Sequence, residues 1–178
     1  MTTPPPITLR PLCMADAPAL AWAMNNQQVQ NNLRDGIPYP YTEKDAEDFI
    51  SKALTVPPDT QYLHVICYDG EYIGGIGVFR QENVHRLAGE IGYHLAEPYW
   101  GRGIMTEAIR QMCSYIFGHT DMIRIFAEPF AHNIASCRAL EKAGFQFEGV
   151  LRQHAIKHGK ILDMKLYSAL KSQWGLAL

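Results

Sequence analysis

The order of its periodic segments is the feature that most constrains the fold of this chain. Strand-like runs at 62–68 and 72–79 flank Asp69-Gly70, a residue pair typical of a tight hairpin turn. A third run, 88–96, alternates apolar and polar residues with the period of a half-buried strand. The remaining runs are helical at 103–117, strand-like at 122–128, helical at 133–143, and strand-like at 145–151 and 161–170. A meander followed by strand–helix–strand–helix–strand predicts a mixed sheet with helices on both faces.

The first third of the chain precedes this pattern. Residues 7–10 are strand-like, and an Ala-rich helix follows up to about Met24. The amide-rich run 25–32 should break or loosen that helix. Thr42 and Asp45 resemble a capping box and predict the start of a further helix.

Two segments of the chain predict loops. The run 34–41 contains one glycine and two prolines, which interrupt regular structure. The polar run 152–161, with Gly159, separates the last two strand-like segments. We expect an extended proline-rich tail at 1–6 and a single domain at 7–172, without an internal linker.

Composition excludes several classes of function. A length of 178 residues with 47% hydrophobic content suits one domain with a full core. The net charge of -2 argues against nucleic acid as a partner, and no run approaches the roughly 20 apolar residues of a membrane helix. The four cysteines show no CxxC spacing, so we expect reduced thiols, no metal and a cytoplasmic protein.

The turn between the third strand and the next helix carries chemistry. Gly101, Arg102 and Gly103 lie at the start of the predicted helix, where N–H groups without intrahelical acceptors and the helix dipole favour an anion. Arg102 adds a charged donor for phosphate. Two glycines in such a place could equally form only a tight turn. The dinucleotide fingerprint needs a third glycine where this chain has Thr106, and the P-loop lysine is missing.

Two longer motifs resemble those of a known family. The run EIGYHLAEPYWGRGIMTEA at 90–108 resembles the coenzyme-A-binding core of GNAT-type N-acetyltransferases, and NIASCRALEKAGF at 133–145 resembles that family's next motif. The similarity extends over about residues 7–170 and is greatest to the branch of ribosomal-protein N-terminal acetyltransferases. It implies an α/β fold (α+β in some schemes) with a mostly antiparallel sheet, a splayed parallel strand pair and acetyl-CoA as cosubstrate.

The resemblance also implies which residues hold the cofactor. The main-chain amides of the turn would bind the pyrophosphate, the strand before it would pair with the pantetheine amides, and Asn133 would bind the pantetheine arm. Trp100 and Met105 depart from the common family pattern, but backbone binding tolerates such changes. The predicted cofactor-binding residues are Tyr93, His94, Leu95, Trp100, Gly101, Arg102, Gly103, Ile104, Met105, Thr106, Asn133 and Ser136.

Acyl transfer to an amine needs a base, an oxyanion donor and a proton for the leaving thiolate. Glu90 is the candidate base, because it lies in an otherwise apolar strand and resembles a catalytic glutamate of some family members. Partial burial would raise its pKa toward a useful range. Alternatively, Glu90 is a strand carboxylate that orders water or pairs with Arg138 or His94.

The proton donor is less evident. Many family members have a tyrosine where this chain has Leu140, so that acid is absent. In the ribosomal-protein branch a serine matching Ser136 resembles the proton donor to the thiolate. The alternative is ordinary helix-start chemistry, with Asn133 as N-cap and Ser136 at N3.

The acceptor is an amine of unidentified structure. We expect the loop 31–41 and the segment 152–161 to surround it, with Arg34, Tyr39 and Tyr41 as substrate-binding residues beside Glu90, although the loop residues could serve packing alone. A protein N-terminus is the first hypothesis and a small amine the second; few acidic residues near the site disfavour a polycation. A CoA-binding module without catalysis is the third. The C-terminal strand and Trp174, which is expected to be exposed, would permit a homodimer.

Overall fold

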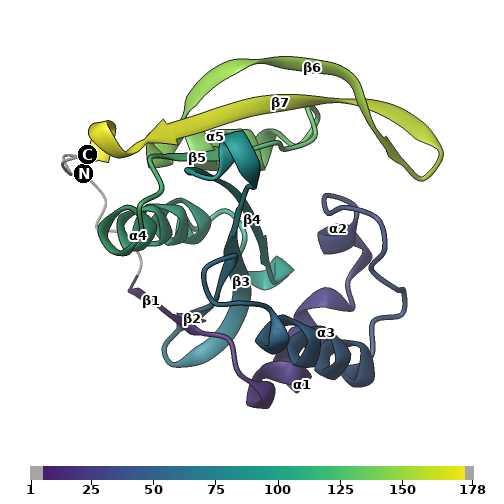
Figure 1. The fold of residues 1–178 in the computed structure, drawn as a ribbon. Helices are drawn as coiled ribbons and strands as arrows, with labels where there is room; N and C mark the ends of the chain where they lie inside the picture. The colour runs from purple at the N-terminus through teal and green to yellow at the C-terminus, as the bar shows by residue number, and fades with distance from the viewer. Residues whose placement is uncertain (1–5, 175–178) are drawn as a thin grey trace.

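The computed structural model describes residues 6–174, so the expected extended segment 1–6 lies, except for Pro6, outside the described residues. Figure 1 shows the order and arrangement of the elements. The strands are β1 (Ile7–Pro11), β2 (Gln61–Tyr68), β3 (Glu71–Arg80), β4 (Ala88–Leu95), β5 (Arg124–Ala127), β6 (Gln146–Lys157) and β7 (Lys160–Leu170). The α-helices are α1 (Ala17–Met24), α2 (Gln27–Gln30), α3 (Glu43–Thr55), α4 (Ile104–His119) and α5 (Ile134–Ala143), with short 3₁₀ turns η1 (Met14–Asp16), η2 (Asn83–His85), η3 (Glu97–Tyr99) and η4 (Lys171–Trp174).

The sheet has seven strands in the order β1-β2-β3-β4-β5-β7-β6. All neighbours are antiparallel except β4 and β5, which are parallel. Pairing between these two strands ends at Glu90 and Phe126, whereas β4 remains paired with β3 up to Leu95. The two parallel strands therefore diverge beyond Glu90. The predicted mixed sheet with a splayed parallel pair is confirmed.

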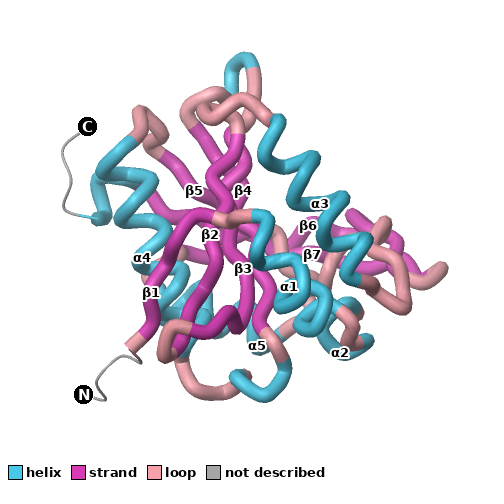
Figure 2. Tube along the Cα trace, turned by 90° about the horizontal axis from the view of Figure 1, so that it is seen from below, coloured by secondary structure: helices cyan, strands magenta, loops and turns pink. Residues whose placement is uncertain are grey.

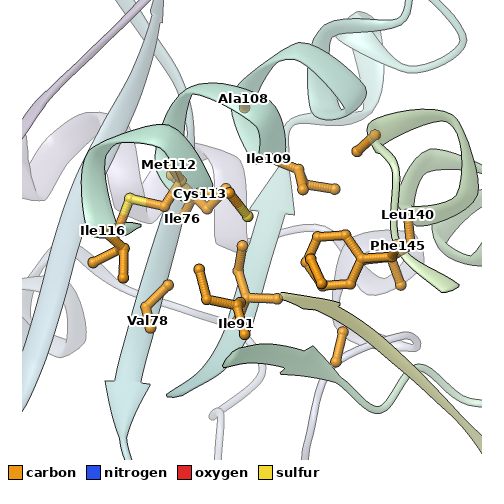
Figure 3. Close-up of a cluster of buried hydrophobic side chains, with 14 of the residues drawn as sticks. Ile76, Val78, Ile91, Ala108, Ile109, Met112, Cys113, Ile116, Leu140 and Phe145 are labelled. Atoms are coloured by element: carbon orange, nitrogen blue, oxygen red, sulfur yellow. The ribbon is translucent and has the colours of Figure 1, made fainter. Parts of the chain in front are cut away.

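Helices cover both faces of the sheet (Figure 2). On one face α4 and α5 enclose a core in which Ile109, Met112, Ile116 and Leu140 are fully buried (Figure 3). On the other face α1 and α3 enclose a second cluster. Because side chains alternate along a strand, successive residues of β4 face these two layers in turn.

Several local predictions hold in detail. Asp69 and Gly70 form the tight turn between β2 and β3. Thr42 and Asp45 form a reciprocal capping box at the start of α3. Gly144 ends α5 in the left-handed conformation that glycine adopts readily.

The prediction of a polar loop at 152–161 is wrong. β6 and β7 continue through this region and pair as far as Lys157 with Lys160, leaving only a two-residue turn at His158-Gly159. Most residues of β6 are exposed, so the strand is stabilised mainly by its main-chain hydrogen bonds to β7. Because buried and exposed residues do not alternate along β6, the sequence shows no strand pattern there. Figure 1 shows the resulting hairpin extending over the sheet toward α2.

The expectation of an exposed Trp174 is also wrong. Its indole packs against Phe117 and Phe145 and donates a hydrogen bond to Ser114 Oγ at 3.1 Å. Trp174 thus closes the end of the domain against α4, and it does not offer the exposed indole on which the homodimer hypothesis partly rested.

Between residues 6 and 174, none of the helices combines the length and the apolar character needed to cross a membrane.

Candidate functional site

The turn between β4 and α4 has the open main chain that its glycines predict. Gly101 and Gly103 have φ values of 75° and 77°, and no atom lies within 4 Å of where a Cβ would be added. The Trp100 indole donates a hydrogen bond to the Leu95 carbonyl oxygen at 2.7 Å, which fixes the turn against the end of β4. Trp100 therefore has a structural contact of its own in the predicted cofactor region.

The start of α4 suits an anion. Gly103 is its N-cap and supplies no side-chain acceptor, so the first N–H groups of this 16-residue helix are left for another partner. Buried Ile104 anchors the helix in the core, while Met105 and Thr106 are partly buried. Arg102 lies over the Tyr99 ring, 5.4 Å from its centroid, with its charge beside the turn. These residues fit a pyrophosphate.

One face of β4 meets the start of α5. The Tyr93 hydroxyl lies 2.8 Å from Ser136 Oγ, and the Ser136 N–H donates to Asn133 Oδ1 at 3.1 Å. Asn133 thus caps α5 as the helix-start interpretation predicts, while the Ser136 hydroxyl remains directed to Tyr93. Burial raises the pKa of the Tyr93 phenol, which keeps it protonated at neutral pH. Tyr93 and Ser136 form a pair of hydroxyl groups on the α4–α5 face of the sheet.

Glu90 lies on the other face of β4, at the last residue pair before β4 and β5 diverge. Its carboxylate forms an ion pair with Arg34, not with Arg138 or His94. Burial raises the pKa of the Glu90 carboxyl above its ordinary value; Arg34 lowers it and the charge of Glu128 raises it further by smaller amounts. Such a carboxylate can accept a proton from an amine.

His94 shares that face with Glu90 but has a different partner. Its Nε2 lies 2.9 Å from the Tyr72 hydroxyl, and burial lowers the pKa of the imidazole to about 4. His94 is therefore neutral at physiological pH. Its side chain belongs to the packing between β3 and β4, so only its main chain is available for the cofactor role predicted for it.

The loop 31–41 carries Arg34 and is held at several points. Asp35 forms an ion pair with Lys157 of β6 at 2.9 Å, and the Lys157 side chain is only 9% exposed. Buried Gln30 donates from Nε2 to the carbonyl oxygens of Met24 at 2.9 Å and Pro38 at 3.0 Å. These contacts fix both sides of the loop, so Arg34 reaches Glu90 from an ordered segment.

The two tyrosines of the loop lie differently. Tyr39 is exposed, as a substrate-contacting residue would be. Tyr41 is buried among the residues of α1 and α3, and its N–H donates to Asn25 Oδ1 at 3.1 Å. Tyr41 also lines an open hollow of about 730 Å³ beside η3, together with Trp22, Asn26 and Pro98.

Sequence reasoning missed two charged residues of the candidate site, Glu128, whose charge acts on Glu90, and Lys157. Glu128 follows β5 directly, and its Oε2 lies 3.8 Å from His154 Nε2. Lys157 holds the loop through Asp35. Glu128 could have been found from its place at the end of the parallel strand, but nothing in the sequence brings Lys157 to Asp35. Within the part of the chain that the structure describes, no group of three or more His, Cys, Asp or Glu residues is placed to hold a metal ion.

Comparison with known proteins assigns this arrangement to a family. The acetyltransferase (GNAT) domain matches residues 7–146. The chain therefore belongs to the GNAT family, and the family predicted from the two motifs is confirmed. It is an acetyl-CoA-dependent N-acetyltransferase of the GNAT type.

Individual relatives agree with this class. The chain is 31% identical over 176 residues to the putative ribosomal N-acetyltransferase YdaF of Bacillus subtilis (strain 168), covering 94% of this chain and 93% of that protein. It is 43% identical over 101 residues to the uncharacterized N-acetyltransferase YoaA of the same strain, a match that spans 57% of this chain and 56% of YoaA. A structure of RimL, a ribosomal L7/L12 alpha-N-protein acetyltransferase in complex with coenzyme A, has the same fold, with a TM-score of 0.84 at 22% identity over 92% of this chain and 93% of that chain.

Proposed function

We propose that this protein acetylates the α-amino group of a polypeptide N-terminus, with Glu90 as the base. The observation that carries this proposal is the place of Glu90: it lies where β4 and β5 begin to diverge, and burial raises its pKa. The putative ribosomal role in the name of YdaF, a relative along nearly the whole chain, supports a protein acceptor.

The cofactor is held mainly by main-chain groups in this proposal. The N–H groups from Gly101 to Thr106 bind the pyrophosphate, and Arg102 adds a positive charge. The unpaired side of β4 from Tyr93 to Leu95, together with Asn133, binds the pantetheine arm. Acetyl-CoA supplies an activated acyl group as a thioester. The Leu95 carbonyl oxygen already accepts a hydrogen bond from the Trp100 indole. The Leu95 N–H is therefore the main-chain group of this residue that can bind the pantetheine arm.

The reacting groups then approach from two faces of the sheet. A nitrogen–carbon bond to the acetyl group forms, the carbon–sulfur bond breaks, and the amine proton passes to Glu90. Ser136 donates a proton to the sulfur, and Tyr93, which contacts Ser136 at 2.8 Å, replaces that proton or orients the hydroxyl. Main-chain N–H groups of β4 stabilise the negative charge on the acetyl oxygen.

Acetylation of a small amine is the second candidate function. Trp22, Asn26 and Tyr41 line an open hollow beside η3, which offers polar and aromatic groups to a compact acceptor. Against this candidate, the hollow is open to solvent at the molecular surface and does not include Glu90 among its lining residues.

Release of CoA from acetyl-CoA in the presence of an amine panel tests the proposed function. The panel contains peptides with free N-termini, the same peptides with blocked N-termini, spermidine, an aminoglycoside and free amino acids. We expect release with free peptides and none with blocked ones. Turnover restricted to a small amine would support the second candidate, and acetyl-CoA binding without turnover on any amine would support a non-catalytic CoA-binding module.

A further inference from the structure

The ion pair between Arg34 and Glu90 leaves most of the guanidinium free. Arg34 Nη2 donates to Glu90 Oε1, while a guanidinium has five N–H groups in a fixed planar fork. The Arg34 side chain is 67% exposed, and that of Glu90 is 22% exposed. The remaining donors therefore face the solvent beside the carboxylate that the proposed function makes the base.

The main chain on both sides of Arg34 is held by contacts that do not involve Glu90. Asp35, the next residue, is held by the nearly buried ammonium of Lys157 on β6. On the other side, Leu33 N–H donates to the Gln30 carbonyl oxygen at 3.0 Å, and the Gln30 side chain joins α1 to the loop. A guanidinium carried by an ordered loop contributes more to specificity than one on a mobile loop, because the loop loses little conformational entropy when the acceptor binds.

An amine placed against Glu90 brings its neighbouring atoms to Arg34. In an amino-terminal residue, the carbonyl carbon is two bonds from the nitrogen, so the carbonyl oxygen lies within about 3–4 Å of the amine. That oxygen is an acceptor for a guanidinium N–H. An alkylamine has a methylene at the same place, and a polyamine continues toward a second positive charge, which Arg34 repels.

We propose that Arg34 is a specificity-determining residue that selects acceptors with a carbonyl group adjacent to the reacting amine and rejects polyamines. This inference rests on the proposed function of Glu90 and deepens it, because it derives the preference for polypeptide N-termini from one side chain. Arg34 has two roles in this arrangement: it holds the ionised form of Glu90 and it binds the acceptor carbonyl.

The test compares Arg34→Gln with the wild type on three acceptors: an alanyl tetrapeptide amide, propylamine and spermidine. The variant-to-wild-type ratio of kcat/KM for each acceptor cancels the different pKa values of the amines. We expect this ratio to be about tenfold or more lower for the peptide than for propylamine, as expected for loss of a charge-assisted hydrogen bond. For spermidine we expect the ratio to be higher than for propylamine, since a repelling charge is removed.

Two further variants separate this effect from damage to the loop. Arg34→Lys retains the charge but not the planar fork, and should give a peptide ratio between those of Arg34→Gln and the wild type. Arg86→Gln, an equal substitution at an exposed arginine between β3 and β4, should change none of the ratios. The acetyl-CoA dissociation constant of each variant, measured by calorimetry, should equal that of the wild type.

The outcomes divide clearly. Equal ratios for all three acceptors overturn the role of Arg34 while leaving the proposed function intact. A wild type that acetylates spermidine better than the peptide overturns the proposed acetylation of polypeptide N-termini, and the preference assigned to Arg34 with it. A wild type that releases no CoA with any of the three acceptors overturns the proposed function itself, and this inference with it.

Discussion

The two sides of the candidate site are built in different ways. The part of the proposed cofactor side that faces the pyrophosphate is one continuous segment, from η3 through the glycine turn into α4, and it offers mainly N–H groups. The acceptor side consists of charged side chains from separate parts of the chain: Arg34 and Asp35 in a loop, Glu90 on β4 and Lys157 on β6. In the proposed function, binding of a constant cofactor therefore depends mainly on the shape of the main chain, whereas acceptor choice depends on a few replaceable side chains.

The largest effect is expected from Glu90→Gln, which removes the proposed base but keeps the shape of the side chain. Turnover should fall by about 10²- to 10⁴-fold, while acetyl-CoA affinity stays unchanged because the cofactor side lacks this residue. Steady-state kinetics and calorimetry measure the two quantities. Glu71→Gln, at the exposed first residue of β3, is the control. If turnover survives in Glu90→Gln, the base lies elsewhere.

The hydroxyl pair should give the next largest effect. Ser136→Ala removes the proposed proton donor, and kcat should fall by about 10- to 100-fold. Tyr93→Phe removes its 2.8 Å partner, and the double variant should be no slower than Ser136→Ala alone, since the two groups act through one proton path. Independent, multiplying losses in the double variant would contradict a shared path. Single-turnover measurements distinguish these results from slow product release.

The cofactor side is tested by Gly103→Ala. A φ of 77° strains any L side chain, at roughly 1–3 kcal/mol, so acetyl-CoA affinity should fall by about tenfold as the turn shifts. Gly159→Ala is the matched control, because Gly159 has a φ of 73° at the tip of the β6–β7 hairpin. Both variants should lose thermal stability by a few degrees, and only Gly103→Ala should bind acetyl-CoA less tightly. Equal acetyl-CoA affinities would remove this turn from the cofactor site.

The smallest expected effect is a shift in pH dependence. Glu90 must be ionised to act as a base, so kcat/KM should fall as the pH drops through its raised pKa. Arg34 lowers this pKa, so Arg34→Gln should move the acidic limb to higher pH. With a hydrazide as acceptor, the reacting nitrogen stays neutral over the pH range measured, so the acidic limb reports the ionisation of the enzyme alone. An unchanged limb would show that Arg34 does not act on the group that titrates.

The difference between the two sides also explains what the sequence could predict. The strand, turn and helix around Gly101 are contiguous, and each follows from local periodicity and turn chemistry, so this region was predicted correctly. The splayed parallel pair was also predicted correctly, but from the family resemblance. The pairing of Glu90 with Arg34 joins residues far apart in the chain, and no local pattern specifies it. The hairpin at 152–161 was missed for a related reason: its strands are exposed, and cross-strand pairing leaves no hydrophobic alternation.

The contact between Lys157 and Asp35 has a consequence for the order in which the molecule is made. During synthesis, all parts of the turn before α4 emerge together, and they can assemble on β2, β3 and β4 while the ribosome is still translating. The loop of Arg34 emerges early but lacks its anchor until β6 has been synthesised and has paired. In the proposed function, the turn that binds the cofactor pyrophosphate is thus synthesised and can fold before the loop that discriminates between acceptors has its anchor.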